Sequence, residues 1–338
     1  MQPVPPTRRA VLTLGLQAGA SLALVAAGLG LHPRAQAQAD NWPARPIKVV
    51  VNFPPGSSPD VLARAIALPL QQALGQPVVV ENRTGASGII GVEQVVKSEP
   101  DGYTLLMTSG SAITNNPHLF PKLPYDPAKD LAAIAPAGRL TLFLVVRGNF
   151  PASDVQGFLA HLKNNPGKVT YGSAGNGTGL HIAGELLKSQ AAVQATHVPY
   201  RGASPALQDL LGGQIDFYFD PGIAVQHVKS GKLKLLATAT PRRSPLFPDT
   251  PTLDEAGLKG FDAGTTHGFY APAGTPRPII ERLNREINRI VQLPEVRTQI
   301  TNMAAEPTPM SPAQFDAVMQ EDSRRYAAII KAQNIRAD

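Results

Sequence analysis

The chain has 338 residues, of which 43% are hydrophobic and 17% charged, and its mean hydropathy is −0.07. This composition excludes a disordered, fibrous or polytopic membrane protein, and the length suggests two domains of roughly 150 residues each. Because the sequence contains no cysteine, disulfides, thiolate zinc sites, cysteine nucleophiles and a lipid-anchored cysteine are also excluded.

The first 39 residues have the organisation of an export signal. Two adjacent arginines precede an uncharged apolar run, residues 11–31, and small residues follow at Ala35, Ala37 and Ala39. This order predicts a cleaved signal peptide, residues 1–39, exported by either the twin-arginine or the general secretory route; the alternative is an uncleaved anchor helix. Without the signal the net charge falls from +6 to about +3, which argues against nucleic-acid binding.

The mature chain then alternates predicted strands with predicted helices. Short β-branched runs predict strands over residues 46–53, 77–80 and 103–107. Apolar residues at helical spacing predict helices over residues 61–70 and 89–96, and a turn is expected over residues 109–112. Such alternation is typical of a largely parallel sheet covered by helices.

A second alternating series begins with a predicted strand over residues 140–146. Its further strands are expected at 169–171, 196–198, 215–219 and 233–238, and its helices at 158–162, 180–187 and 206–211. The remaining chain is rich in proline and has helical patterns only around residues 279–290 and 315–330. A return of this C-terminal segment to the first lobe would explain its position after the second series.

Two loops that join a predicted strand to a predicted helix have the composition of anion-binding sites. In residues 54–60, Ser58 is placed to cap the helix, Pro59 suits the first helical position and Asp60 the first turn. Residues 172–179 are rich in glycine, which lets a ligand approach the backbone closely. Either loop alone is equally well explained as a tight corner, but two of them at the carboxyl ends of strands in separate lobes predict a cleft.

The common enzyme motifs are absent from the sequence. It contains no nucleotide P-loop, dinucleotide fingerprint, nucleophile elbow or zinc-protease motif. His181 and Glu185 lie four residues apart and could hold a metal or act as acid and base, although a packed histidine beside a paired glutamate explains this spacing better. Asp60 and Asp220 could be paired carboxylates, but a cap role and a strand-end role are favoured. We expect no metal and no cofactor.

Motifs spread in order along the whole mature chain resemble those of one receptor family. They occupy residues 46–56, 60–64, 74–83, 100–106, 123–127, 172–177, 181–185, 197–200, 209–213 and 271–276. The sequence is therefore similar to the substrate-binding receptors of tripartite tricarboxylate transporters, also called Bug proteins.

The resemblance implies an α/β periplasmic binding protein of the two-lobed, type II flytrap kind, with two crossing strands as hinge. The lobes would be residues 40–141 with 240–338, and residues 142–239. Such a protein binds a small organic anion, a carboxylate, between its lobes and presents it to membrane permease subunits or to a sensor, as a monomer without enzyme activity. The rival interpretation is a secreted enzyme acting on a small carboxylate, with His181 and Glu185, or Asp220, as acid and base.

The ligand contacts that the resemblance implies come from both lobes. Those of the first lobe are Phe53, Pro55, Gly56, Ser57, Ser58, Asp60, Ser109, Gly110, Ser111 and His267. Those of the second are Ala174, Gly175, Asn176, Gly177, Thr178, His181, Tyr200, Arg201, Gly202 and Asp220.

Three residues depart from the family pattern. Ser57 replaces the second glycine of the first loop and adds a hydroxyl group, whereas Pro221 replaces an asparagine and removes a donor. His267 replaces an aromatic residue before a glycine. Its imidazole is expected either to add a titratable group to the cleft or to pack within the lobe.

Overall fold

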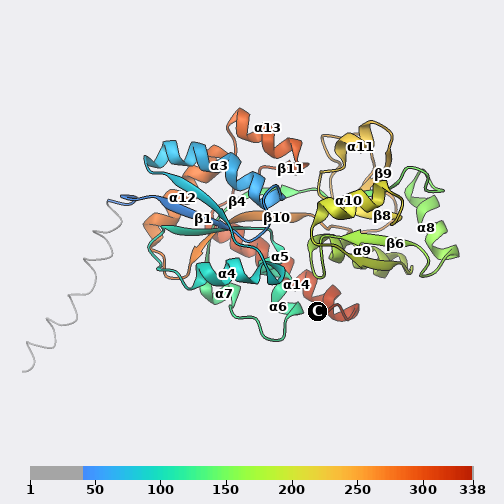
Figure 1. Ribbon diagram of the computed structural model, residues 1–338, viewed down its shortest axis with the longest axis horizontal. Coiled ribbons are helices and arrows are strands. Elements are labelled where there is room, and N and C mark those ends of the chain that lie inside the picture. Colours follow the sequence, from blue (N-terminus) through green and yellow to red (C-terminus); the bar gives the residue numbers. More distant parts are fainter. Residues whose placement is uncertain (1–40, 337–338) are drawn as a thin grey trace, which may run out of the picture. The chain divides into compact units, whose positions relative to one another are not determined.

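The computed structural model describes residues 41–336, so the predicted signal peptide, residues 1–39, lies outside the described residues. The described residues fall into two units, one that ends at Ala44 and a compact second one that begins at Arg45. The architecture below is that of the second unit (Figure 1). No helix within the described part of the chain is long and apolar enough to cross a membrane.

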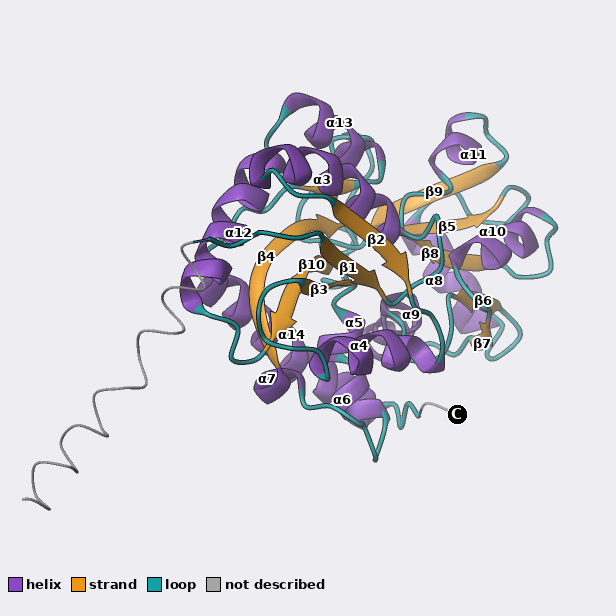
Figure 2. Cartoon of the chain, turned by 60° about the vertical axis from the view of Figure 1, so that its left-hand side comes forward, coloured by secondary structure: helices purple, strands orange, loops and turns teal. Residues whose placement is uncertain are grey.

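The first sheet has six strands in the order β11-β4-β10-β3-β1-β2. Figure 2 shows β4, β10, β3, β1 and β2 side by side. They are β1 (Ile47–Val51), β2 (Val78–Asn82), β3 (Thr104–Thr108), β4 (Leu131–Leu140), β10 (Thr265–Pro272) and β11 (Ala305–Glu306). Strands β1, β2 and β3 pair in parallel, whereas β10 is antiparallel to both β3 and β4, and β11 is antiparallel to β4. The expected largely parallel sheet is therefore a mixed one.

Helices cover both faces of this sheet (Figure 1). On one face lie α3 (Ser58–Leu74), α12 (Arg277–Ile290) and α13 (Pro294–Asn302), and on the other α4 (Ile89–Val96), α5 (Ser111–Thr114) and α14 (Pro312–Ala332). Short elements occupy the loops: η1 (Ala86–Gly88), α6 (Asn116–Leu119) and α7 (Pro127–Asp130). In α12 the buried residues Ile279, Ile280, Leu283, Ile287 and Ile290 recur at helical spacing, so one apolar stripe faces the core.

The second sheet has five strands in the order β7-β6-β8-β5-β9. They are β5 (Phe143–Arg147), β6 (Thr170–Ser173), β7 (Thr196–Pro199), β8 (Phe217–Asp220) and β9 (Leu233–Thr238), and the helices here are α8 (Val155–Asn164), α9 (Gly179–Ala191), α10 (Ala203–Leu211) and α11 (Val225–Lys229). Phe217 lies in the core, edge-on to Phe158 at a centroid distance of 5.1 Å and stacked on Tyr171 at 5.3 Å. The two sheets, each packed with its own helices, confirm the predicted two-lobed α/β architecture.

The chain crosses from the first sheet to the second between β4 and β5, and returns between β9 and β10. The two crossing segments are bonded to each other, because the amide of Ala239 donates to the carbonyl of Leu142 at 2.7 Å. The amide of Thr141 donates to the carbonyl of Ala304 at 2.9 Å, which ties the outgoing segment to the chain just before β11. The segments that link the lobes thus form a bonded strip.

The strand predicted over residues 140–146 corresponds to β5, which begins at Phe143, whereas Leu140 is the last residue of β4. Strands β4, β10 and β11 were not predicted. Strand β4 has the sequence LAAIAPAGRL, whose alanine, proline and glycine are poor strand formers. Pro136 is tolerated opposite Gly268, where the register of β4 against β10 shifts. The expected turn at residues 109–112 also runs into the helical turn α5.

Candidate functional site

The two predicted anion loops have the same construction. In each, a glycine with positive φ lies two residues before the helix: Gly56, at +78°, before α3, and Gly177, at +73°, before α9. The amide of Gly56 donates to Oδ2 of Asp60 at 2.9 Å, and the amide of Gly177 donates to Nδ1 of His181 at 3.0 Å. A side chain of the first helical turn thus reaches back to the loop backbone, as in a capping box but one residue further.

The residues that precede the two helices also behave alike. Ser57 and Thr178 have extended backbones, and neither side chain caps its helix. Instead, the Ser57 hydroxyl donates to the carbonyl of Pro54 at 2.6 Å, and the Thr178 hydroxyl donates to that of Gly175 at 2.8 Å. The first-turn amides of α3 and α9 are therefore left without a side-chain cap, and such amides, at the positive end of the helix dipole, attract an anion.

Asp60 is buried and bonded within its own lobe. Its carboxylate accepts from Gly56, from Nδ2 of Asn82 at 2.9 Å and from Nε of Arg64 at 3.0 Å. Burial alone would raise the pKa of Asp60, but the hydrogen bonds from Arg64, Gly56 and Asn82 hold that pKa below its usual value. The geometry gives Asp60 a role in shaping the loop.

The other predicted residues of the first lobe lie just after β1 and β3, at the start of α3 and on β10. Oγ of Ser58 lies 3.1 Å from Nε2 of His267, and Thr108, just before Ser109, pairs with Gly268, just after His267. The hydroxyls of Ser109 and Ser111 are 2.8 Å apart. A Cβ on Gly110 would lie 3.0 Å from the carbonyl of Thr266, so this loop packs closely on β10. Phe53 is half-buried, and Pro55 is exposed.

His267 is 3% exposed, and it packs within the lobe. Burial lowers the pKa of its imidazole to about 3, so the side chain is neutral at physiological pH. Of the two roles expected for His267, packing is the one that its burial favours.

His181 belongs to a buried cluster beneath the second loop. Its ring stacks on His197 at a centroid distance of 3.8 Å, and Nε2 of His197 lies 2.6 Å from Oγ of Ser173. Burial, followed by the charge of Lys188, lowers the pKa of His181 to about 4. The neutral imidazole can therefore accept the hydrogen bond from Gly177.

Glu185 lies in the same cluster, 3.8 Å from Nε2 of His181. Its carboxylate accepts from the hydroxyl of Tyr171 at 2.6 Å and from Nζ of Lys188 at 2.7 Å. With His181 and Glu185 both buried and bonded in this way, their spacing is that of a packed histidine beside a paired glutamate.

The remaining predicted residues of the second lobe lie at strand ends and in loops. The Tyr200 amide donates to the carbonyl of Ser173 at 3.1 Å, which holds Tyr200 beside the second loop, and its hydroxyl donates to Asp209 at 2.7 Å. Arg201 is exposed, and Gly202 precedes α10. Ala174, Gly175 and Asn176 are all half-buried in the loop.

Asp220 is 1% exposed at the end of β8. Its carboxylate accepts from the amides of Gly222 at 2.8 Å and Ala224 at 3.0 Å, so it bonds the turn that follows its own strand. Burial raises the pKa of Asp220 to about 6. Pro221, which replaces the family's asparagine, is buried in this turn.

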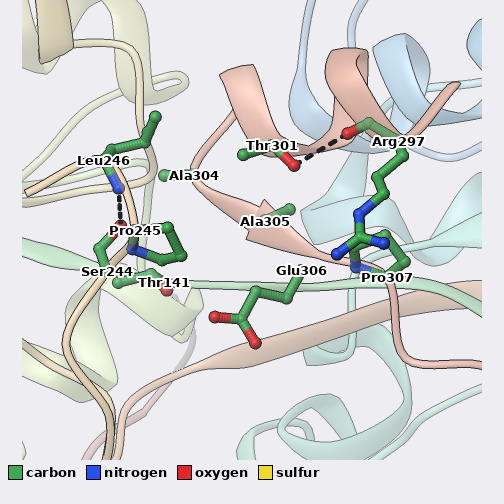
Figure 3. A pocket seen from close by; sticks show the side chains of 10 residues that line it. All are labelled: Thr141, Ser244, Pro245, Leu246, Arg297, Thr301, Ala304, Ala305, Glu306 and Pro307. Carbon is green, nitrogen blue, oxygen red and sulfur yellow. Dashed lines mark hydrogen bonds between the residues drawn. The ribbon is translucent and has the colours of Figure 1, made fainter. Parts of the chain in front are cut away.

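A cavity of about 420 Å³ lies beside the crossing segments (Figure 3). It is lined by Thr141, Ser244, Pro245, Leu246, Arg297, Thr301, Ala304, Ala305, Glu306 and Pro307. None of these ten residues belongs to either loop, and none was predicted to bind the ligand.

The structure also places at the loops residues that the sequence did not indicate. Nδ2 of Asn82 donates both to the carboxylate of Asp60 and to the carbonyl of Phe53, the second bond at 3.0 Å. Asn115, from the first lobe, donates to the carbonyl of Gly177 in the second lobe at 2.8 Å. In the sequence, asparagine before Asn116 and Pro117 signals only a turn.

Comparison with known proteins gives a consistent result. Residues 62–335 match the model of the tripartite tricarboxylate transporter family receptor. The protein BugT of Bordetella pertussis is 37% identical over 300 residues, which are 88% of this chain and 92% of BugT.

Two solved structures of Rhodopseudomonas palustris proteins are also similar. MatC with bound malate is 34% identical with a TM-score of 0.78, and the match covers 86% of this chain and 100% of MatC. Rpa4515 with adipate is 29% identical with a TM-score of 0.82, and the match covers 88% of this chain and 100% of Rpa4515.

Proposed function

Since the chain belongs to the tripartite tricarboxylate transporter family receptors, we propose that it holds a small organic carboxylate between its two matched loops. We further propose that it delivers this ligand to the membrane subunits of a tripartite transporter. The similar proteins bound to malate and adipate favour a dicarboxylate. The chain would act as a monomer in the periplasm after removal of residues 1–39.

The observation that carries the proposal is the shared construction of the two loops. Both N-cap hydroxyls turn back to loop carbonyls, at 2.6 Å for Ser57 and 2.8 Å for Thr178, so neither occupies the helix amides. Neutral amides at a helix N-terminus hold a carboxylate without a buried cation. Two such ends, one in each lobe, suit a ligand with a carboxylate at either end.

The lobes proposed for this action are residues 40–141 with 240–338, and residues 142–239, which move about the crossing segments. The uncapped first-turn amides of α3 and α9 make the principal contacts, with hydroxyls of Ser58, Ser109 and Ser111 beside them. Asp60 and His181 position the loops, and Asp220 positions the turn after β8. Tyr200, Arg201 and Gly202 close over the ligand from the second lobe, and His267 lies behind Ser58.

We propose no enzyme activity. The groups that the rival interpretation would use as acid and base, His181 and Glu185, are 7% and 5% exposed. Both side chains are already bonded, to Gly177 and to Tyr171 and Lys188 respectively. Ligand recovered after incubation should therefore be chemically unchanged, and turnover abolished by His181→Ala would favour the enzyme.

The test is a thermal-shift and calorimetric screen of residues 40–338 against malate, adipate, citrate, monocarboxylates and amino acids. A ligand at 100 times its dissociation constant should add about 2.7 kcal/mol to the free energy of unfolding. Denaturing extraction and mass spectrometry identify any ligand that co-purifies. If no carboxylate shifts the melting temperature and none co-purifies, the proposal fails.

One substitution separates binding from stability. Ser58→Asp places a carboxylate at the first helical position of α3, where it suits the helix dipole but repels an anionic ligand. We expect affinity to fall at least tenfold, with the melting temperature unchanged or raised. The matched control is Pro294→Asp, at the first position of α13 and away from both loops, which should leave affinity unchanged.

A further inference from the structure

A buried asparagine joins the two lobes at the second loop. Asn115 lies between α5 and α6 in the first lobe and is 1% exposed. Its Nδ2 donates to the carbonyl of Gly177 at 2.8 Å, across 62 positions of the chain. This bond exists only while the lobes are in contact here.

The donor is held in place within the first lobe. The hydroxyl of Thr114 lies 2.8 Å from Oδ1 of Asn115, which leaves the Nδ2 side of the amide to face Gly177. The same hydroxyl lies 3.0 Å from the carbonyl of Gly110, in the loop that also contains Ser109 and Ser111. The orientation of the Asn115 side chain is thus linked to one of the proposed ligand loops.

The acceptor, the carbonyl of Gly177, is also fixed within its own lobe. The Gly177 amide donates to His181 at 3.0 Å, so both polar groups of this glycine are bonded, one to each lobe. A Cβ at Gly177 would lie 2.1 Å from Cδ1 of Leu119, and its φ is +73°. Only glycine lets the two lobes approach this closely here.

We propose that Asn115, Gly177 and His181 form a latch that holds the lobes closed, with Asn115 and His181 as positioning residues for the bound ligand. The latch concerns the site of the proposed function and rests on it for the ligand-dependent part of the test. Closing the lobes makes the Asn115 bond, and opening them breaks it. The latch therefore slows ligand release, and it also favours the closed form of the ligand-free protein.

The charges around His181 explain why a neutral imidazole, and not a carboxylate, accepts the hydrogen bond from the Gly177 amide. The groups that face its ring are His197, Tyr171, Glu185 and Lys188, and the last two form an ion pair at 2.7 Å. In the first lobe the equivalent acceptor, Asp60, has Arg64 as partner. In the second lobe Lys188 already forms an ion pair with Glu185. A second buried carboxylate at position 181 would have no cationic partner, so a neutral acceptor fits there.

The chain offers a matched pair of variants in adjacent residues. Asn115→Asp removes the donor and opposes two oxygen atoms across the lobes. Asn116→Asp makes the same change at a residue that is 3% exposed, but Asn116 donates to Tyr125 and Ser87 within the first lobe. Asn115→Ser, which removes the donor without adding a charge, replaces Asn115→Asp if circular dichroism shows that the latter is unfolded.

Lobe opening can be measured without any ligand. Because the chain has no cysteine, Gln72→Cys on α3 and Lys163→Cys on α8 give two unique positions for spin labels. In distance distributions from pulsed electron paramagnetic resonance, Asn115→Asp should raise the ratio of open to closed molecules about three- to tenfold. Asn116→Asp should leave that ratio as in the wild type.

A second measurement uses malate and adipate as probes in stopped-flow experiments. Asn115→Asp should raise the dissociation rate about three- to tenfold and should not lower the association rate, because the open form that captures ligand is populated at least as much as in the wild type. His181→Asn, whose Oδ1 can replace Nδ1 as acceptor, should keep the wild-type rate, whereas His181→Phe should behave like Asn115→Asp.

The two readouts separate failure of the latch from failure of the proposed function. If neither probe binds, the distance distributions of the ligand-free protein still test the latch. Equal distributions for Asn115→Asp and the wild type, or an equal shift in Asn116→Asp, would overturn it.

Discussion

The buried imidazole of His267 makes a specific prediction about acid stability. His267 is 3% exposed, and burial lowers its pKa to about 3, whereas an unfolded histidine titrates near 6.5. Between pH 6 and pH 4 the unfolded chain therefore binds nearly one proton here and the folded chain none. Stability present above pH 6.5 is lost as the pH falls, by about 1.4 kcal/mol for each pH unit from this residue.

The substitution that tests this reasoning is His267→Phe, which restores the aromatic residue usual in the family and removes the titrating group. We expect the wild type to lose about 2 to 3 kcal/mol more than the variant between pH 7 and pH 4. Urea unfolding followed by circular dichroism at several pH values measures the difference. Ser58→Ala, which removes the hydroxyl 3.1 Å from Nε2, is the control, because it leaves the imidazole buried and should keep the wild-type slope. Parallel pH profiles for His267→Phe and the wild type would refute the argument.

Two further predictions concern the loops. Asp60→Asn should lower the free energy of unfolding at pH 7 by about 2 kcal/mol, because charge-assisted bonds from Gly56 and Arg64 are lost. Since the pKa of Asp60 is lowered in the folded chain, this stability is lost as the pH falls, and urea melts of the two proteins should converge below about pH 4; a constant difference would contradict the assignment. Gly175 has a φ of +130°, and a Cβ added there would lie 3.4 Å from the carbonyl oxygen of Tyr200. Gly175→Val should therefore weaken carboxylate binding at least tenfold in calorimetry. Gly213→Val, in a turn with open space and φ +74°, is strained without touching the loops and should leave affinity unchanged, so equal losses in both would exclude a local effect.

Elements with a strong local signal could be predicted from the sequence. Helix α4 and strand β9 have the predicted bounds, because apolar spacing in the first and a leucine-rich run in the second are local properties. Strand β10 was missed for a physical reason. It is buried on both faces between β3 and β4, so it shows no alternation of polar and apolar residues, and Gly268 interrupts it.

In the candidate site, too, some features could be predicted from the sequence and others could not. Glycine composition predicted both loops, but the expected cap at Ser58 is wrong, because Ser57 is the N-cap residue and its hydroxyl donates to Pro54. The spacing of Gly56 from Asp60 repeats in Gly177 and His181, so the second acceptor could have been found by comparison with the first. The Asn115 bond and the stack of His181 on His197 could not. These contacts join residues far apart in the chain, and their formation depends on how the lobes and the sheet pack.

The charges at the two loops bear on how the protein selects its ligand. In the first loop the carboxylate of Asp60 is bonded to Arg64, and in the second the acceptor is a neutral histidine, so neither loop brings an uncompensated charge. In the proposed function, selection of an anion depends on oriented backbone amides at the two helix ends, where Gly56, Gly177 and their acceptors fix the loop backbone. Amides distinguish a carboxylate by geometry and not by net charge alone. If the two loops hold the ligand as proposed, the length and polarity of that ligand depend on side chains beside the loops, such as Ser57, while the loops themselves stay the same.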